Sequence, residues 1–339
     1  MASVREIAKQ LGVSAATVSR AMNNHPLVAE DVRQRVIVAM NRSRYVPTVG
    51  RRETMNIAFA YTGVASIGSP FDAALMQGMS DRMEQCGFDL MVLDLRRAML
   101  PRENYTQMFL RKGIRAAVLR TTADTMDICR QIAAEGFPAL VVGYHFDEPE
   151  VNYIYSNSYA GSCEAMSHLV DLGHTRIAIS LHVVDDSDHT DRLNAWQYVM
   201  KQNKLAVPDK FVIRAPASLE GGAQLVRRIA GMVPRPTAVY IADPLVAVGA
   251  IAEARQMGWD IPRDLSIVGF DDSELRYMVY PKLTAVCQDA RAVGQEAFEL
   301  INRLLGVSGD EATETVFRRT LATHFEVNGS TAPPGKSSL

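Results

Sequence analysis

Basic side chains gather at the start of the chain, where they could bind a polyanion. The first 52 residues hold nine lysine and arginine side chains against three acidic ones, whereas the remainder holds 27 basic and 35 acidic side chains. The net charge of −2 is therefore an average over a basic segment and an acidic body. Such asymmetry predicts a polyanion partner, such as nucleic acid, at one end only. The basic side chains are Arg5, Lys9, Arg20, Arg33, Arg35, Arg42, Arg44, Arg51 and Arg52.

Short helices are expected to position these side chains. Ser3 and Glu6 have the spacing of a capping box at the start of a first helix, and Gly12 suits the position after its end. Ser14 can then cap a second helix that runs to about Met22. Two short helices separated by a tight turn that contains glycine are typical of a helix-turn-helix.

The outward face of the second helix suits a close approach to a groove, because it offers small residues together with Arg20. A third helix is expected near residues 31–42, with Asp31 as its cap. The three helices together predict an all-α headpiece.

The residues from Val4 to Asn23, followed by Tyr45-Val46-Pro47, resemble the headpiece of LacI/GalR-type transcriptional regulators. The resemblance implies that the second helix enters the major groove of operator DNA. Ala15, Ala16 and Arg20 would then face base edges, since arginine can bond guanine twice and alanine methyls suit thymine. The other residues expected to contact or flank DNA are Ser3, Ser14, Thr17, Ser19, Asn23, Arg51 and Arg52.

The segment that follows the headpiece departs from the family pattern. Family members carry a hinge helix there, with a leucine that wedges into the minor groove and kinks the DNA. Residues 48–55 contain no leucine and leave little room for two helical turns. We expect a short, basic and mobile linker, with a truncated hinge helix, that follows the phosphates without strong kinking.

Short apolar runs alternate with helical patterns from residue 56 onward. This alternation predicts parallel sheets in doubly wound form, and the pattern restarts near residue 177, which indicates two similar lobes. The apolar runs expected to be buried strands are 56–61, 88–93, 116–119, 139–142, 177–181, 237–242 and 265–270.

The body also resembles the effector domain of the same regulators, which in turn is similar to periplasmic sugar-binding proteins of type I. The clearest match is Ile261-Pro262 with Leu265-Ser266-Ile267-Val268-Gly269-Phe270-Asp271. The expected parts are a headpiece (1–47), a linker (48–55), an effector-binding and dimerisation domain (56–328) with an N-lobe (56–155 and 288–312) and a C-lobe (156–287 and 313–328), and a disordered tail (329–339).

Effector contacts are expected beyond the carboxyl ends of the strands, where ligands bind in such folds. Carboxylates and arginine suit a polyol because each can take two adjacent hydroxyls. Paired arginines would also admit an anionic effector, so a sugar, a sugar acid and a sugar phosphate all stay open. The resemblance implies that Arg192 matches the arginine with which the family grips its ligand. Together with the strand ends it gives the candidate residues Phe71, Asp72, Arg120, Arg192, Trp196, Asp243, Asp271 and Gln288.

The sequence therefore predicts a cytoplasmic transcriptional regulator, most simply a repressor, whose operator binding responds to a small carbohydrate or a compound derived from one. A twofold homodimer would match two headpieces to a pseudo-palindromic operator. The alternative is a stand-alone sugar-binding module of periplasmic type. That alternative lacks an explanation for the basic helices, and the N-terminus shows no signal peptide.

Other functions find little support in the sequence. The chain has no apolar run long enough for a membrane span, and its four cysteines form no C-x-x-C pair. The acidic run 185–191 lacks the glycine and the twelfth-position glutamate of a calcium loop. We find no nucleophile or base motif of an enzyme, and we expect no cofactor and no metal.

Overall fold

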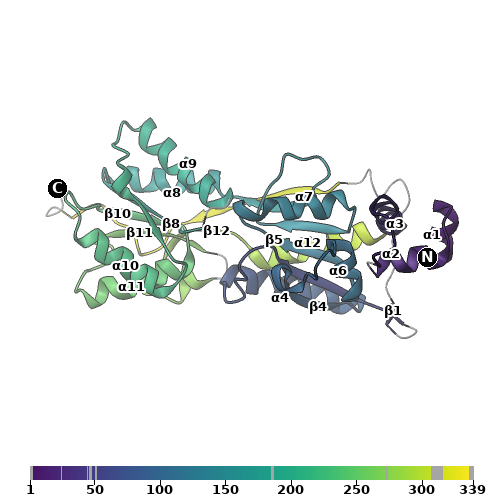
Figure 1. Ribbon diagram of the computed structural model, residues 1–339. Helices are drawn as coiled ribbons and strands as arrows, with labels where there is room; N and C mark the ends of the chain where they lie inside the picture. Colours follow the sequence, from purple (N-terminus) through teal and green to yellow (C-terminus); the bar gives the residue numbers. More distant parts are fainter. Residues whose placement is uncertain are drawn as a thin grey trace. The chain divides into compact units, whose positions relative to one another are not determined.

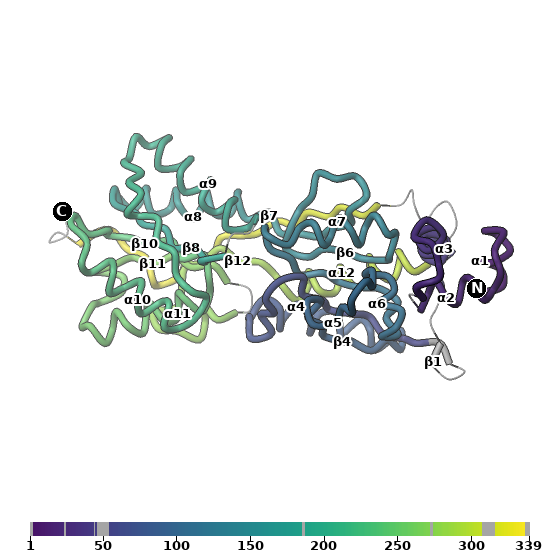
Figure 2. Tube along the Cα trace, viewed as in Figure 1, coloured from purple at the N-terminus to yellow at the C-terminus, as the bar shows by residue number. Residues whose placement is uncertain are grey.

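The computed structural model forms two compact units, and each is described by itself (Figures 1 and 2). The first unit comprises Met1–Gly68, Leu75–Tyr155 and Arg291–Arg319, and the second comprises Ser69–Ala74, Ser156–Ala290 and Thr320–Leu339. The structure describes residues 3–335 apart from 24, 44, 46–47, 50–51, 185–186, 272–273 and 307–315.

The headpiece opens the first unit with three helices, α1 (Val4–Leu11), α2 (Ala15–Met22) and α3 (Glu30–Arg42). The predicted capping box is present, because Ser3 Oγ accepts from the Glu6 amide and the Glu6 carboxylate accepts from the Ser3 amide. Gly12 follows α1 with a φ of 67°, the left-handed conformation that glycine favours. The helix-turn-helix prediction is confirmed, and the helices enclose a small core that includes Ile7, Val18, Ala21 and Met40.

The expected cap of the third helix was wrong. Ala29 occupies the N-cap of α3, and no side chain bonds the first turn there. Asp31 instead lies within the first turn with Glu30, where a negative charge still interacts favourably with the helix dipole.

The linker contains two short antiparallel strands, β1 (Thr48–Val49) and β2 (Arg52–Glu53). Thr48 pairs with Glu53 and Val49 pairs with Arg52. Among the described residues of this segment there is no hinge helix. Arg51, a candidate phosphate contact, lies outside the described residues, and the side chain of Arg52 is likewise not described.

The N-lobe is the part of the first unit that follows the linker, and it is built on a six-stranded sheet in the order β13-β7-β6-β5-β3-β4. The pairs from β4 through β3, β5 and β6 to β7 are parallel. The strands are β3 (Asn56–Tyr61), β4 (Asp89–Asp94), β5 (Ile114–Arg120), β6 (Ala139–Val142), β7 (Tyr153–Asn157) and β13 (Arg318–Ala322).

Helices α6 and α7 pack on one face of this sheet, where Phe109 and Ile132 meet Ala58, Ala117 and other buried residues. Phe109 also stacks on Phe137, with ring centroids 4.4 Å apart. The helices are α4 (Pro70–Met83), α5 (Leu95–Ala98), α6 (Tyr105–Arg111), α7 (Met126–Ala134) and α12 (Ala290–Gly306), with short 3-10 turns at Glu84–Cys86 and Ala123–Thr125. The start of α4, as far as Ala74, belongs to the second unit.

The C-lobe, which is the second unit, repeats the arrangement with a sheet in the order β14-β12-β11-β10-β8-β9. Strands β8 to β12 pair in parallel and β14 runs antiparallel to β12. The strands are β8 (Ile177–His182), β9 (Val212–Ala215), β10 (Ala238–Ile241), β11 (Ser266–Asp271), β12 (Thr284–Cys287) and β14 (His324–Glu326).

Helices cover both faces of the second sheet, with α8 and α9 on one face and α10 and α11 on the other (Figure 1). Glycines let α10 and α11 approach each other, because a Cβ on Gly222 would lie 2.2 Å from the Val246 carbonyl oxygen. The helices are α8 (Tyr159–Asp171), α9 (Ser187–Gln202), α10 (Leu219–Ala230) and α11 (Pro244–Gln256), with 3-10 turns at Asp209–Phe211 and Leu275–Tyr277.

The two sheets share one strand order, which confirms the expected pair of similar, doubly wound lobes. The last passage of the chain between the two units was expected at residues 312/313, and in the structure it lies at Arg319/Thr320. This boundary falls within β13, the edge strand beyond β7 in the first sheet.

The prediction of a disordered tail was wrong for residues 329–335. Ser330 is fully buried, its hydroxyl donates to the Ile267 carbonyl, and the Thr284 amide donates to that hydroxyl. The Ile267 amide donates to the Ser330 carbonyl, so this segment continues the hydrogen bonding of β11 and β12. Composition hid this role because glycine, serine and proline also suit a tight, buried segment. Residues 336–339 lie outside the described part of the chain.

Two histidines hold this C-terminal segment. His174 Nε2 bonds the Ala332 carbonyl oxygen and its Nδ1 bonds the Thr237 hydroxyl, both at 2.9 Å. His168 Nε2 bonds the Thr331 hydroxyl at 2.9 Å. Burial lowers the pKa of both histidines, because desolvation penalises the imidazolium.

We expect the C-lobe to lose stability as the pH falls below about 6.5, the ordinary pKa of histidine. The unfolded chain then binds more protons at these positions than the folded chain, so unfolding becomes more favourable. Urea unfolding between pH 7.5 and 5 should show a smaller loss in a His174→Gln variant than in the wild type. An equal loss in both proteins would contradict this assignment.

Candidate functional site

The outward face of α2 is the predicted groove-reading surface, and it is open to solvent. Val18 and Ala21 on the opposite face are fully buried in the headpiece core. Ala15, Ala16 and Arg20 are exposed, as their helical spacing from the buried pair requires. Ser14, Ser19 and Asn23 are exposed alongside them, and Thr17 is partly exposed.

The polar residues on this face also shape the helix itself. Ser14 Oγ accepts from the Thr17 amide at 3.0 Å and lies 2.8 Å from the Thr17 hydroxyl. The Asn23 amide group donates to the Ser19 carbonyl at 2.8 Å, near the end of α2. These contacts fix the first and last turns, so the residues that could reach DNA project from a rigid helix. Ser3 occupies the corresponding N-cap of α1.

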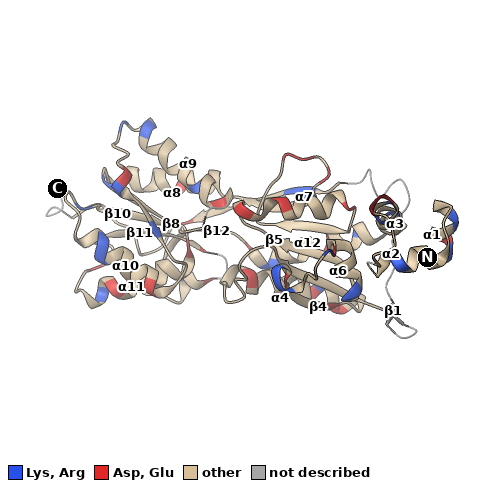
Figure 3. Ribbon diagram, in the orientation of Figure 1, with Lys and Arg blue, Asp and Glu red and all other residues tan. Residues whose placement is uncertain are grey.

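Charge on the headpiece fits a polyanion. Lys9 lies in the last turn of α1 and Arg20 in the last turn of α2, and Figure 3 marks the basic positions along these helices. The two acidic residues of α3, Glu30 and Asp31, both lie in its first turn. Basic side chains near phosphates supply affinity that does not depend on sequence, because they release counterions.

Arg192 is the best positioned of the predicted effector contacts in the C-lobe. The side chain lies on α9 and is buried, and its guanidinium carbon lies 3.6 Å from the centroid of the Phe270 ring. Its Nη1 donates to the Ala242 carbonyl oxygen at 2.7 Å, just beyond the carboxyl end of β10. Asp188 lies one turn earlier on α9, with a carboxylate oxygen 3.8 Å from Nη2. The guanidinium is therefore held at the end of the sheet where ligands bind in this fold.

Two histidines that we did not predict extend this cluster. His182 is the last residue of β8 and His189 lies on α9, with their ring centroids 6.0 Å apart. The position of His182 at the end of a parallel strand could have predicted it as a site residue. The sequence prediction considered carboxylates, arginines and a glutamine among the polar residues but no histidine. The cluster thus combines a cation, a carboxylate and two imidazoles.

Two predicted carboxylates lie at the same ends of strands but accept hydrogen bonds from residues a few positions further along the chain. Asp243 caps α11 by accepting from the Val246 amide at 3.0 Å, and burial raises the pKa of its carboxyl group. Asp271 is fully buried and accepts from the Leu275 amide and from Arg276 Nη1, the latter at 2.7 Å. Their contact with an effector stays a prediction, while their local role is to hold the loops after β10 and β11.

The prediction that Trp196 lines the effector site was wrong. Its ring is fully buried in the C-lobe core, and its Nε1 donates to the Ile177 carbonyl at 3.1 Å. Ile177 is the first residue of β8, so Trp196 lies at the amino end of the strand rather than at the carboxyl end. Helix α9 runs antiparallel to β8, so each successive turn of α9 lies further from the carboxyl end of the strand. Trp196 lies one turn beyond Arg192 and is therefore further from the site.

The N-lobe presents Arg120 at the carboxyl end of β5, where its Nη1 donates to the Val142 carbonyl oxygen at 2.9 Å. A group of threonines that we did not predict lies at the same edge. Thr62 Oγ1 bonds the hydroxyls of Thr121 and Thr125 at 3.0 and 2.7 Å. Hydroxyl groups that follow two adjacent strands suit a hydroxylated ligand.

The remaining candidates are buried near the ends of elements. Phe71 and Asp72 lie in the first turn of α4, with Asp72 fully buried. Gln288 follows β12, and its amide donates to the Asp271 carbonyl at 3.1 Å. The structure thus places Phe71, Asp72 and Gln288 in the second unit, which also holds Asp243 and Asp271.

One group of side chains has the composition of a metal site. The ligand atoms of Cys287, His324 and Glu326 lie within 4.8 Å of one another. The Glu326 carboxylate already pairs with Arg276, whose Nε is 3.0 Å away. A guanidinium in this position competes with a metal cation for the same oxygens.

Comparison with known proteins finds matches for both the headpiece and the effector domain. A family model described as "Bacterial regulatory proteins, lacI family" matches residues 3–48, and one described as "Periplasmic binding protein-like domain" matches residues 166–331. MalR of Streptomyces coelicolor, a helix-turn-helix transcriptional regulator, is 31% identical over 344 residues, which cover 98% of this chain and 97% of MalR. The ribose operon repressor of Haemophilus influenzae is 28% identical over 89% of this chain and 91% of its own length.

A solved structure of the lac repressor dimer bound to operator and the anti-inducer ONPF shares the fold. Its TM-score is 0.68 at 22% identity, and the match covers 98% of this chain and 99% of that one. The matched headpiece and effector domain define a DNA-binding regulator of transcription. The chain belongs to the lacI family of bacterial regulatory proteins. It acts as a regulator and not as an enzyme, as its curated relatives do.

The part of the chain that the structure describes contains no helix that is long and apolar enough to cross a membrane.

Proposed function

We propose that this regulator is a cytoplasmic repressor that binds a pseudo-palindromic operator as a homodimer, with the exposed face of α2 in the major groove. The observation that supports this DNA contact is the capped helix whose outward face carries Arg20 among small side chains. Arginine can bond the O6 and N7 atoms of guanine, while alanines let the backbone come close. The names of the ribose operon repressor and of the lac repressor dimer bound to operator support repression and the dimer.

We propose further that a carbohydrate, or a compound derived from one, binds at the carboxyl ends of the C-lobe strands and changes operator affinity. Arg192 carries this proposal, because its guanidinium is held between the Phe270 ring and the Ala242 carbonyl beside Asp188. An aromatic ring with a cation and a carboxylate nearby suits a polar ring that bears hydroxyls. The cation also suits an acid or phosphate group, so sugars, sugar acids and sugar phosphates are the three classes to test.

A thermal-shift screen separates these classes. An effector at 100 times its Kd stabilises the protein by about 2.7 kcal/mol, which corresponds to roughly 5–10 °C for a domain of this size. We expect one class to raise the melting temperature of the wild type and of an Arg263→Ala control, whose arginine is a surface residue paired with Asp260. Operator binding without any response to the three classes would sink the effector proposal and leave the regulator assignment intact.

A further inference from the structure

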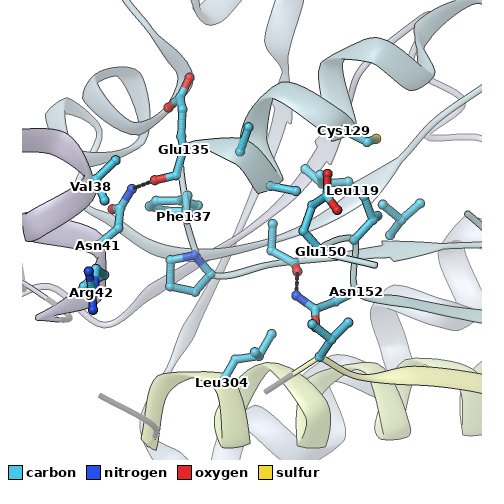
Figure 4. Close-up of a pocket in the computed structure, with 18 residues that line it drawn as sticks. Val38, Asn41, Arg42, Leu119, Cys129, Glu135, Phe137, Glu150, Asn152 and Leu304 are labelled. Carbon is cyan, nitrogen blue, oxygen red and sulfur yellow. Dashed lines mark hydrogen bonds between the residues drawn. The ribbon is translucent and has the colours of Figure 1, made fainter. Parts of the chain in front are cut away.

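The headpiece and the N-lobe, which belong to the same compact unit, share buried polar contacts (Figure 4). Asn41 lies in the last turn of α3, and its Nδ2 donates to the Glu135 carbonyl oxygen at 2.5 Å. The same group donates to the Thr106 hydroxyl at 3.0 Å. Asn41 is 5% exposed and Thr106 is fully buried, so these bonds are shielded from water.

A second contact reaches the end of α2. Gln107 Nε2, on α6, donates to the Ala21 carbonyl oxygen at 2.6 Å. Carbonyl oxygens in the last turn of a helix lack their usual partners within that helix. Gln107 therefore gives the Ala21 carbonyl a hydrogen-bond donor from the N-lobe. Gln107 is 3% exposed, and the contact is therefore enclosed.

The N-lobe side of both contacts is fixed in advance by local structure. The backbone amide of Asn104 donates to Gln107 Oε1, and the backbone amide of Gln107 donates to Asn104 Oδ1, which forms a capping box. This arrangement fixes the Gln107 side chain so that its NH₂ group reaches the Ala21 carbonyl. The Glu135 carboxylate accepts from the amides of Tyr105 and Thr106. The start of α6 and the end of α7 are thus tied together, which sets the position of the Glu135 carbonyl.

Apolar contact between the headpiece and the N-lobe leaves a pocket open. Leu110 of α6 packs against the headpiece core. A separate open pocket of about 290 Å³ is lined by Val38 and Arg42 of α3 and by Phe137 and Leu304 of the N-lobe. The headpiece is thus held by three directional hydrogen bonds together with the packing of Leu110, and a contact of this kind can form and release.

The held position leaves the outward face of α2 uncovered. Ala15, Ala16, Ser19 and Arg20 stay exposed while the Ala21 carbonyl faces Gln107. Docking of the headpiece and binding of a major groove therefore use different sides of the same helix.

We propose that the N-lobe docks its own headpiece through Asn41 and Gln107, so that the lobe itself sets the orientation of α2 in a chain whose linker contains the paired strands β1 and β2. The consequence for operator binding rests on the proposed function. A docked headpiece has fewer orientations to lose on binding, so docking favours the operator complex and transmits displacement of the N-lobe to α2.

A disulfide trap tests the docking without DNA or effector. A Cβ on Gly136 would lie 3.7 Å from the Asn41 Cβ, within the range of disulfides. We would introduce Asn41→Cys and Gly136→Cys together with Cys86→Ser, because Cys86 is an exposed thiol. The control pair is Lys9→Cys with Gly136→Cys, since Lys9 is exposed on α1 and the substitution at the positive φ of Gly136 is common to both pairs.

Mild oxidation of the full-length variants is followed by non-reducing electrophoresis and by mass spectrometry of the linked peptides. We expect the Asn41/Gly136 pair to form an intramolecular disulfide at least about tenfold faster than the control pair. Equal rates would mean that the headpiece moves freely on its linker, and the docking proposal would be overturned.

The effect on DNA binding is measured on an Asn41→Ala/Gln107→Ala variant. The variant loses the three hydrogen bonds that hold the headpiece, and only part of this loss reaches the operator complex, so we expect operator affinity to fall by roughly tenfold while affinity for random duplex DNA is unchanged. A Gln10→Ala variant, altered at an exposed position of α1, should behave as the wild type. Unchanged operator affinity would contradict the role in DNA binding. Loss of both kinds of binding would point to a misfolded headpiece and would be checked by the helical circular dichroism signal, with Asn41→Ser then replacing Asn41→Ala.

Discussion

Replacement of Arg20 by alanine is expected to abolish operator recognition while the protein stays folded. Arg20 is exposed in the last turn of α2, and the helix does not need its side chain for capping or packing. A bidentate contact to guanine is worth about 1–3 kcal/mol per half-site, so two half-sites predict a loss of at least roughly 30-fold in affinity. Fluorescence anisotropy with operator and random duplexes at one salt concentration measures the ratio.

The control for this experiment is Arg228→Ala, which removes an equal charge from an exposed position on α10 of the C-lobe. We expect the control to keep the preference for operator over random DNA. A parallel fall of both affinities in Arg20→Ala would show that Arg20 contacts phosphate and not a base. Full retention of specificity would show that the groove-reading helix is misassigned.

Replacement of Arg192 by alanine should have the opposite outcome, with operator binding retained and the response to effector lost. The guanidinium is fixed by the Ala242 carbonyl and the Phe270 ring, so a ligand meets a group that is already oriented. Two charge-assisted hydrogen bonds to the ligand are together worth about 3 kcal/mol or more, which predicts a loss on the order of 100-fold in effector affinity. Titration calorimetry with the effector found in the thermal-shift screen measures this loss.

Arg192 is also buried, so its loss will lower stability, and the melting temperature without effector has to be measured alongside. Arg192→Lys provides the second variant. It keeps the charge but loses the planar group that stacks and bonds in two directions, so affinity should stay well below that of the wild type. Normal effector affinity in Arg192→Lys or in a folded Arg192→Ala would remove Arg192 from the site.

The fold was predictable from the sequence where the pattern was local. The caps at Ser3 and Ser14 and the turn at Gly12 defined the helix-turn-helix, because side chains within four residues of each other decide such features. All seven expected strands are present with small shifts at their ends. Long apolar runs between helices suffice to identify the buried strands of a parallel sheet.

Other elements depended on partners far away in the sequence. Strands β7, β9, β12, β13 and β14 were not predicted, because runs of three to five residues become strands only when a neighbouring strand supplies hydrogen bonds. The same reason explains residues 329–335, whose partners are Ser266, Ile267 and Thr284. A third case is Asn41, whose partners Thr106 and Glu135 lie 65 and 94 residues away.

The candidate site shows a similar division. A position after a strand was enough to select Arg120, Asp243 and Asp271, since the ends of parallel strands share one edge. The sequence left open how many turns of α9 lie beside the site, and for this reason Trp196, one turn beyond Arg192, was placed at the wrong end of β8. Composition alone also could not reveal that Asp243 and Asp271 accept hydrogen bonds from the backbone amides of Val246 and Leu275.

The buried segment at 329–335 bears on how this protein can be handled and fused. A chain shortened to residue 328 would remove the Ser330 hydroxyl and carbonyl and would leave the amides of Ile267 and Thr284 without these acceptors. Affinity tags and reporter domains are therefore best joined after Leu339, behind a flexible spacer, because a bulky partner fused earlier would compete with β11 and β12 for the end of the chain. A stretch that looks dispensable by composition thus marks the last permissible boundary of the folded protein.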